Sequence, residues 1–100
     1  MTHIKTVDDF LSYLALSKGA SKNTVSAYQR DLTGFAAFVS EIPTDILSVT
    51  GDEISSYKKH LSAKGFSASS VSRAMSSVRS FYKYLLVGGV IHENPARAVK

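Results

Sequence analysis

Four segments of the chain carry apolar residues at intervals of three and four positions, and each segment is closed by glycine or proline. This spacing places the apolar side chains on one face of an α-helix, and glycine and proline end helices. We expect helices over about residues 6–18, 21–40, 50–64 and 67–87, with a short packed connection at 46–49. No segment has the alternating pattern of a β-strand. Since 100 residues can form one core without disulfides, the sequence predicts a single all-α domain.

The helix starts differ in whether they carry acidic residues. We expect Thr6 to begin the first helix, with Asp8-Asp9 in its first turn, and the third helix to open on Asp52-Glu53 after the N-cap Thr50. Carboxylates at these positions stabilise the helix dipole and repel a phosphate. The second and fourth helices open instead on hydroxyl and amide side chains, after Ser21 and Ser67, and leave positive potential for a phosphate. Alternatively, these residues act only as caps.

Positive charge is concentrated in the second half of the chain. Residues 1–53 carry four Lys/Arg and seven Asp/Glu, whereas residues 54–92 carry six Lys/Arg and no Asp/Glu. A long stretch without a carboxylate is typical of a surface that binds a polyanion, but it also fits a solvated basic face. Lys58 and Lys59 on the third helix are the densest charge in this stretch.

The outward faces of the second and fourth helices are small and polar. Seven of the fourteen residues from Ser67 to Ser80 are serine, which is a poorer helix former than alanine. Small hydroxyl-bearing side chains let a helix approach a DNA groove closely, and longer basic side chains reach past them. A merely solvated helix would more often carry Glu–Lys pairs four residues apart. We therefore favour DNA contact by these two faces.

The same two helices carry motifs that resemble a known family. Residues 21–32 (SKNTVSAYQRDL) resemble the opening of the second helix in phage-integrase and Xer-type tyrosine recombinases. Residues 70–85 (SVSRAMSSVRSFYKYL) resemble another helix of that family. The spacing between the motifs and the exit into the interdomain linker are matched by Val49-Thr50, Glu53-Ile54, Tyr57 and Asn94-Pro95. The resemblance covers essentially the whole chain.

The resemblance implies an N-terminal core-binding (SAM-like) domain, a four-helix bundle of two helical hairpins that forms half of a clamp around duplex DNA. Residues 1–92 would form this domain, and residues 93–100 would begin the linker to an absent catalytic domain. The implied partners are double-stranded DNA and other recombinase protomers in the assembled complex. In this family the second and fourth helices lie against the major groove. The DNA contacts carried over are Lys22, Asn23, Ser26, Arg30, Ser69, Ser70, Arg73, Ser76 and Lys83.

Recombinase chemistry is not expected from this chain itself. In the family, a tyrosine nucleophile and an arginine/histidine cluster lie on a second domain, and no His-x-x-Arg occurs here. Arg79 lies at the flank of the apolar stripe, where it fits a structural role equally well. We expect no metal site, because the chain has no cysteine and His3, His60 and His92 lack ligand spacing. We also expect no cofactor, no membrane partner and a cytoplasmic location, since no apolar stretch suits a signal segment or a membrane span.

Two other functions fit a small helical domain. One is a protein-interaction module of the SAM or death-domain type, although the serine-rich face lacks the aromatic anchors that such surfaces favour. The other is a helix-turn-helix regulator, in which residues 65–68 would form the turn. In that case the fourth helix alone would read the DNA and the second would lie off it. Affinity for duplex at low salt and the involvement of Lys22 distinguish these functions.

Overall fold

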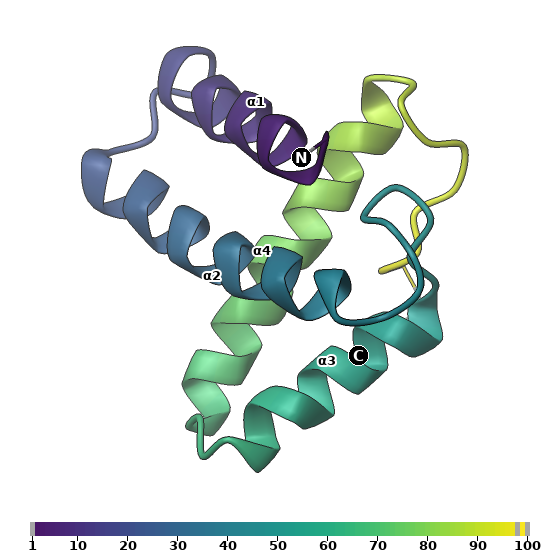
Figure 1. Cartoon of the computed structure of the whole chain (residues 1–100). Coiled ribbons are helices and arrows are strands. Elements are labelled where there is room, and N and C mark those ends of the chain that lie inside the picture. Colours follow the sequence, from purple (N-terminus) through teal and green to yellow (C-terminus); the bar gives the residue numbers. More distant parts are fainter. Residues whose placement is uncertain (1, 98, 100) are drawn as a thin grey trace.

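The computed structural model describes residues 2–97 and 99, with side chains from residue 5 onward, and within them it contains four α-helices and no strand. The helices are α1 (Thr2–Leu16), α2 (Lys22–Ser40), α3 (Gly51–Ala63) and α4 (Ala68–Val87). α1 and α2 form one hairpin, α3 and α4 form the other, and α2 crosses over the long α4 (Figure 1). The predicted all-α fold of two helical hairpins is confirmed.

Side-chain caps fix where α2, α3 and α4 begin. The hydroxyls of Ser21 and Ser67 each accept a hydrogen bond of 3.2 Å from the backbone N–H three residues ahead. Thr50 and Glu53 cap each other's backbone N–H groups in a capping box. Gly65 follows α3 with a φ of 91°, which L side chains rarely adopt, and turns the chain into α4. The predicted starts of these three helices are confirmed.

The predicted start of the first helix is wrong. α1 begins at Thr2, not at Thr6, and it has no acidic residue in its first turn. Asp8 and Asp9 therefore lie farther along the helix. No glycine or proline precedes Thr6, so nothing in this segment prevents the helix from extending towards the N-terminus. Among the four described helices, only α3 opens on acidic residues.

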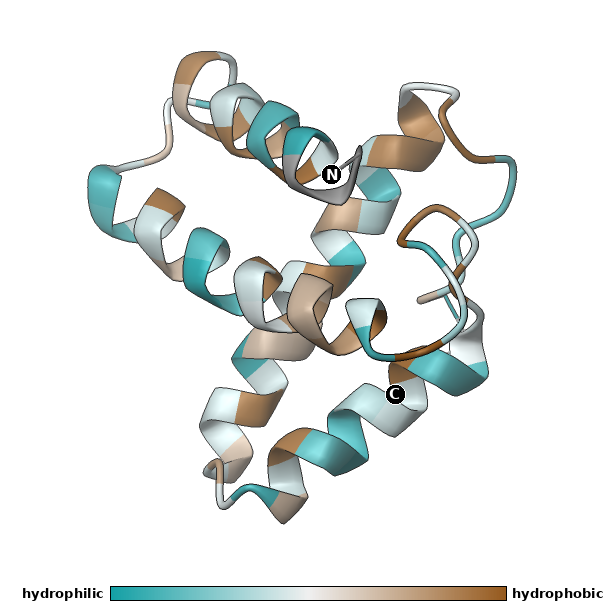
Figure 2. Ribbon diagram, in the orientation of Figure 1, coloured by the Kyte–Doolittle hydropathy of each residue, from teal (hydrophilic) through white to brown (hydrophobic). Residues whose placement is uncertain are grey.

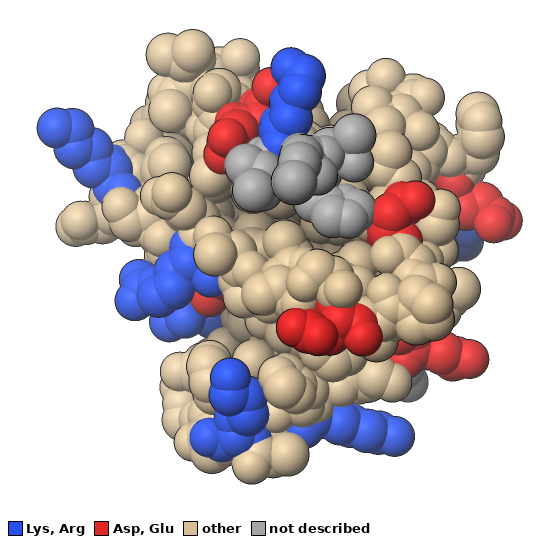
Figure 3. Space-filling view, viewed as in Figure 1, with Lys and Arg blue, Asp and Glu red and all other residues tan. Residues whose placement is uncertain are grey.

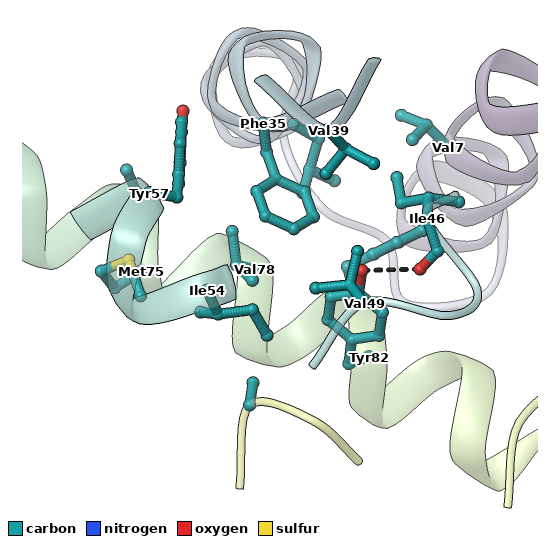
Figure 4. Close-up of a cluster of buried hydrophobic side chains, with 14 of the residues drawn as sticks. Val7, Phe35, Val39, Ile46, Val49, Ile54, Tyr57, Met75, Val78 and Tyr82 are labelled. Atoms are coloured by element: carbon teal, nitrogen blue, oxygen red, sulfur yellow. Dashed lines mark hydrogen bonds between the residues drawn. The ribbon is translucent and has the colours of Figure 1, made fainter. Parts of the chain in front are cut away.

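Aromatic side chains join the two hairpins. Along each helix, hydrophobic residues recur among hydrophilic ones (Figure 2), as expected for an amphipathic helix with one apolar face. Phe10 of α1 meets Phe81 of α4 edge to face, and Phe35 of α2 meets Tyr82 of α4 in the same way. The hydroxyl of the fully buried Tyr82 donates a hydrogen bond of 2.7 Å to the carbonyl oxygen of Ile46 (Figure 4). This bond anchors the connection between the hairpins, and the predicted packing of that connection is confirmed.

The segment after α4 returns to the body of the domain. Ala96 is buried in the core, and its backbone N–H donates to the side chain of Asn94, which forms the predicted turn. Arg79 donates a hydrogen bond of 3.2 Å to the carbonyl oxygen of Val99. Arg79 thus makes a structural contact, one of the two roles that fitted its position beside the apolar stripe. Residues 98 and 100 of the expected linker lie outside the described residues.

Candidate nucleic-acid interface

Basic and acidic side chains are unevenly distributed over the face of the molecule that Figure 3 shows. In the view of Figure 3, Lys and Arg gather at the left and lower edges, over the N-terminal halves of α2 and α4, the C-terminal half of α3 and the turn that joins α3 to α4. Most Asp and Glu side chains lie at the centre and right of this view and over α1. The basic side therefore includes α2, although the first half of the sequence is acidic overall.

The predicted contact residues of α2 lie on its solvent-exposed side. Lys22 and Asn23 belong to the first turn, Ser26 follows one turn later, and Arg30 one turn after that. All four side chains are exposed. The first turn of α2 contains no acidic residue, so the positive end of the helix dipole is not opposed by a carboxylate there.

The predicted contact residues of α4 also lie at its surface. Ser69, Arg73, Ser76 and Lys83 are exposed, and Ser70 is half-buried in the first turn. The first turn of α4 is free of acidic residues, as in α2. The structure thus makes all nine predicted residues accessible. Whether they touch DNA stays a prediction.

Arg73 is paired with an acidic residue that the sequence did not single out. Its Nε and Nη2 donate hydrogen bonds of 3.2 and 2.9 Å to the two carboxylate oxygens of Asp31 on α2. Ser77 of α4 donates a third bond of 2.7 Å to the same carboxylate. The Asp31 side chain is 4% exposed and that of Arg73 is 47% exposed. These hydrogen bonds and the charge of Asp31 raise the pKa of Arg73 above its ordinary value.

A signal for this pair is present in the sequence. Asp31 stands three residues after Tyr28 and four before the fully buried Phe35, on the side of α2 that faces the core, so a carboxylate there needs a partner. Asp31 and Arg73 belong to the two motifs of the family resemblance, 42 residues apart. Helical spacing assigns Arg73 only to the outward side of α4, and it cannot reveal a partner on another helix. The pair therefore emerges only when α2 and α4 cross.

The buried tyrosines are held in their neutral form. Burial and, secondarily, the charge of Asp31 raise the pKa of Tyr57 to about 12. Burial, followed by the charges of Asp45 and Glu53, raises the pKa of Tyr82 still further above its ordinary range. A nucleophile requires the opposite shift. Tyr82 instead contributes to the core through its bond to the hairpin connection.

Among the residues with described side chains, no cluster of three His, Asp or Glu is placed to hold a metal ion, and His3 lies outside that set. Within the same part of the chain, no helix has the length and apolar character needed to cross a bilayer.

Residues 7–89 match the family described as the phage integrase N-terminal SAM-like domain. The chain belongs to this family. The integrase SAM-like domain described here is 36% identical over 89 residues to the tyrosine recombinase XerD of Rhizobium meliloti, covering 89% of the chain and 29% of the relative. It is 40% identical over 92 residues to the tyrosine recombinase XerC of Listeria monocytogenes, covering 91% of the chain and 31% of the relative. No solved structure matches it.

The family match places the two motifs in context. It includes all of α2 and α4 and hence the pair of Asp31 and Arg73. A third relative, a putative tyrosine recombinase of Caldanaerobacter subterraneus, is 34% identical over 93 residues, covering 93% of the chain and 32% of that protein. This SAM-like domain thus spans about a third of the length of these relatives. The resemblance to tyrosine recombinases is confirmed.

Proposed function

We propose that this SAM-like domain binds duplex DNA through the outward sides of α2 and α4, as part of an enzyme that integrates DNA or recombines specific sites. The observation that carries the proposal is the basic side of the molecule, where the starts of α2 and α4 lie without an acidic residue in their first turns. Positive potential, backbone N–H groups and small hydroxyl side chains at such helix starts suit backbone phosphates. The proposed contacts are Lys22, Asn23, Ser26, Arg30, Ser69, Ser70, Arg73, Ser76 and Lys83.

The proposed surface excludes the basic residues of α3. That helix opens on Asp52 and Glu53, which would repel a phosphate approaching its start. Lys58 is half-buried, so only part of its side chain is available to a ligand. Charge density alone would choose α3, whose Lys59 is exposed, whereas the charges at the helix starts favour α2 and α4.

We further propose how the domain fits a longer enzyme. Residues 1–92 form the DNA-binding unit and residues 93–100 begin the connection to a catalytic domain, which supplies the nucleophile. The partners are duplex DNA and other recombinase protomers, and the enzyme acts in the cytoplasm. The high pKa of Tyr57 and the burial of Tyr82 support placing the chemistry outside this chain.

The 100-residue chain is expected to bind duplex DNA weakly and with little sequence preference. One domain lacks the gain in effective concentration that a second DNA-binding domain provides. The Kd should fall in the range of about 10⁻⁴–10⁻⁶ M at physiological salt and decrease steeply as salt is lowered. Fluorescence anisotropy with two duplexes of unrelated sequence, titrated at several salt concentrations, measures this. A protein-interaction module would show no affinity at the lowest salt, and sub-nanomolar selective binding would contradict the expectation.

The same chain is expected neither to cleave nor to relax a supercoiled plasmid. Cleavage by a tyrosine requires an activated phenol beside groups that stabilise the phosphate charge. Incubation with supercoiled plasmid, followed by gel electrophoresis and mass spectrometry of the protein, tests this. A covalent adduct on Tyr28, Tyr57 or Tyr82 would show that the domain carries chemistry of its own.

A further inference from the structure

The pair of Asp31 and Arg73 fixes one edge of the guanidinium of Arg73, a side chain that is about half exposed. The carboxylate binds Nε and Nη2, which leaves the Nη1 edge outside the pair. Ser77 stands one turn after Arg73 on α4 and donates to the same carboxylate. The carboxylate is thus held by three donors in the crossing of α2 and α4, while 47% of the Arg73 side chain remains exposed. The guanidinium therefore has a defined orientation at the surface before any ligand arrives.

We infer that Asp31 is a positioning residue for DNA binding: together with Ser77, it orients Arg73 so that the Nη1 edge donates to a backbone phosphate. The inference rests on the proposed function and assigns a role to a residue that does not itself touch DNA. An unpaired arginine loses rotamer freedom when it contacts a phosphate, whereas Arg73 has already lost it on folding. Preorganised donors bind more tightly for this reason.

Electrostatics alone leads to the opposite expectation. The charge of Asp31 opposes that of Arg73, so a carboxylate at this position should weaken the attraction for DNA. The change Asp31→Asn makes the net charge more positive by one and removes the bidentate acceptor, with nearly the same side-chain shape. Preorganisation of Arg73 therefore predicts that Asp31→Asn weakens DNA binding, whereas net charge alone predicts that it strengthens binding.

The test is a titration of the 100-residue chain with a duplex of about two helical turns at low salt, below the unfolding temperature of every variant. Asp31→Asn is expected to weaken binding about tenfold, the typical effect of losing a charge-assisted hydrogen bond. Glu41→Gln is the matched control, because Glu41 is exposed at the end of α2 and gives the same charge change. It should leave the affinity unchanged or slightly higher. If Asp31→Asn binds as tightly as the unmodified chain, or more tightly, the inference is overturned.

A second variant covers the case in which Asp31→Asn does not fold. Arg73→Lys keeps the charge but cannot hold the carboxylate through two donors. It should weaken binding about as much as Asp31→Asn, and the double variant should bind no worse than either single one, since both remove one interaction. In the unmodified chain, NMR of the Arg73 Nε–H reports on the pair directly. This proton should stay protected from exchange when duplex is added, and faster exchange in the complex would overturn the inference.

The failure of this inference can be told apart from the failure of the proposed function. Lys22→Ala/Arg30→Ala removes two proposed contacts and leaves Asp31, Arg73 and Ser77 untouched. If that variant binds DNA normally, the proposed surface is wrong. If it binds weakly while Asp31→Asn binds well, the surface stands and only the positioning role of Asp31 is lost.

Discussion

Arg73→Ala is expected to lower the free energy of unfolding by about 2–4 kcal/mol, a large effect for a side chain that is 47% exposed. The reason is that the substitution leaves the carboxylate of Asp31, 4% exposed, with Ser77 as its remaining donor. This range extends below the usual cost of breaking a fully buried ion pair, because water can reach the carboxylate of Asp31 from the side that Arg73 occupied. Urea unfolding followed by circular dichroism measures the change.

The control for this prediction is Arg30→Ala. Arg30 has the same charge, is exposed on α2, and immediately precedes Asp31 in the sequence. Its replacement should change the free energy of unfolding by no more than about 0.5 kcal/mol. Adding Asp31→Asn to Arg73→Ala should recover part of the loss, because no uncompensated charge is then buried. Equal costs for Arg73→Ala and Arg30→Ala would show that the pair contributes little to stability.

The plot of log binding constant against log salt concentration has a negative slope for DNA binding. Lys22→Ala/Arg30→Ala is expected to reduce the magnitude of this slope by close to two. Each lost phosphate contact removes about 0.9 from the slope. Both side chains are exposed on α2, so the fold should persist. Arg73 is left intact, since its removal would combine a loss of contact with a loss of stability. Anisotropy titrations over a series of salt concentrations give the slope.

Lys59→Ala/Lys64→Ala provides the matched comparison for the DNA-binding surface. Both lysines are exposed, one on α3 and the other at its C-terminal cap, and the charge change is identical. These residues lie on the basic side of the molecule but are not among the proposed contacts, so the slope should change by much less than for the α2 variant. If Lys59→Ala/Lys64→Ala reduces the slope as much as the α2 variant or more, the proposed surface is wrong and only the family membership stands. A helix-turn-helix protein that reads DNA with α4 alone would bind normally without Lys22 and Arg30.

Most of the fold was predictable because its determinants are local. The starts of α2, α3 and α4 follow from Ser21, Thr50 and Ser67, whose side chains bond backbone groups three residues away. The start of α1 was not predictable from the same kind of signal, because the pattern of Thr6 and Asp9 also fits the interior of a helix. A capping pattern decides a boundary only where the preceding residues cannot extend the helix.

The candidate site was predictable as a surface but not as a network. Helical spacing correctly places residues such as Lys22, Ser26 and Ser76 at the surface. It treats each helix separately, so it could not show that Arg73 reaches across to Asp31 on α2. Ser77 illustrates the same limit, since a serine-rich segment suggests exposure while this hydroxyl is buried and bonded to Asp31. Contacts between distant helices depend on the angle at which they cross, which periodicity does not encode.

The division into two hairpins has a thermodynamic consequence for ligand binding. α2 belongs to the first hairpin and α4 to the second, and their aromatic residues complete one core only when the hairpins dock. A surface built from both helices therefore exists only in the docked state. Any molecule that spans α2 and α4 must bind this state in preference to the unfolded chain, and by linkage it raises the melting temperature as its concentration exceeds its Kd. Ligand binding and hairpin docking in this domain are therefore thermodynamically coupled.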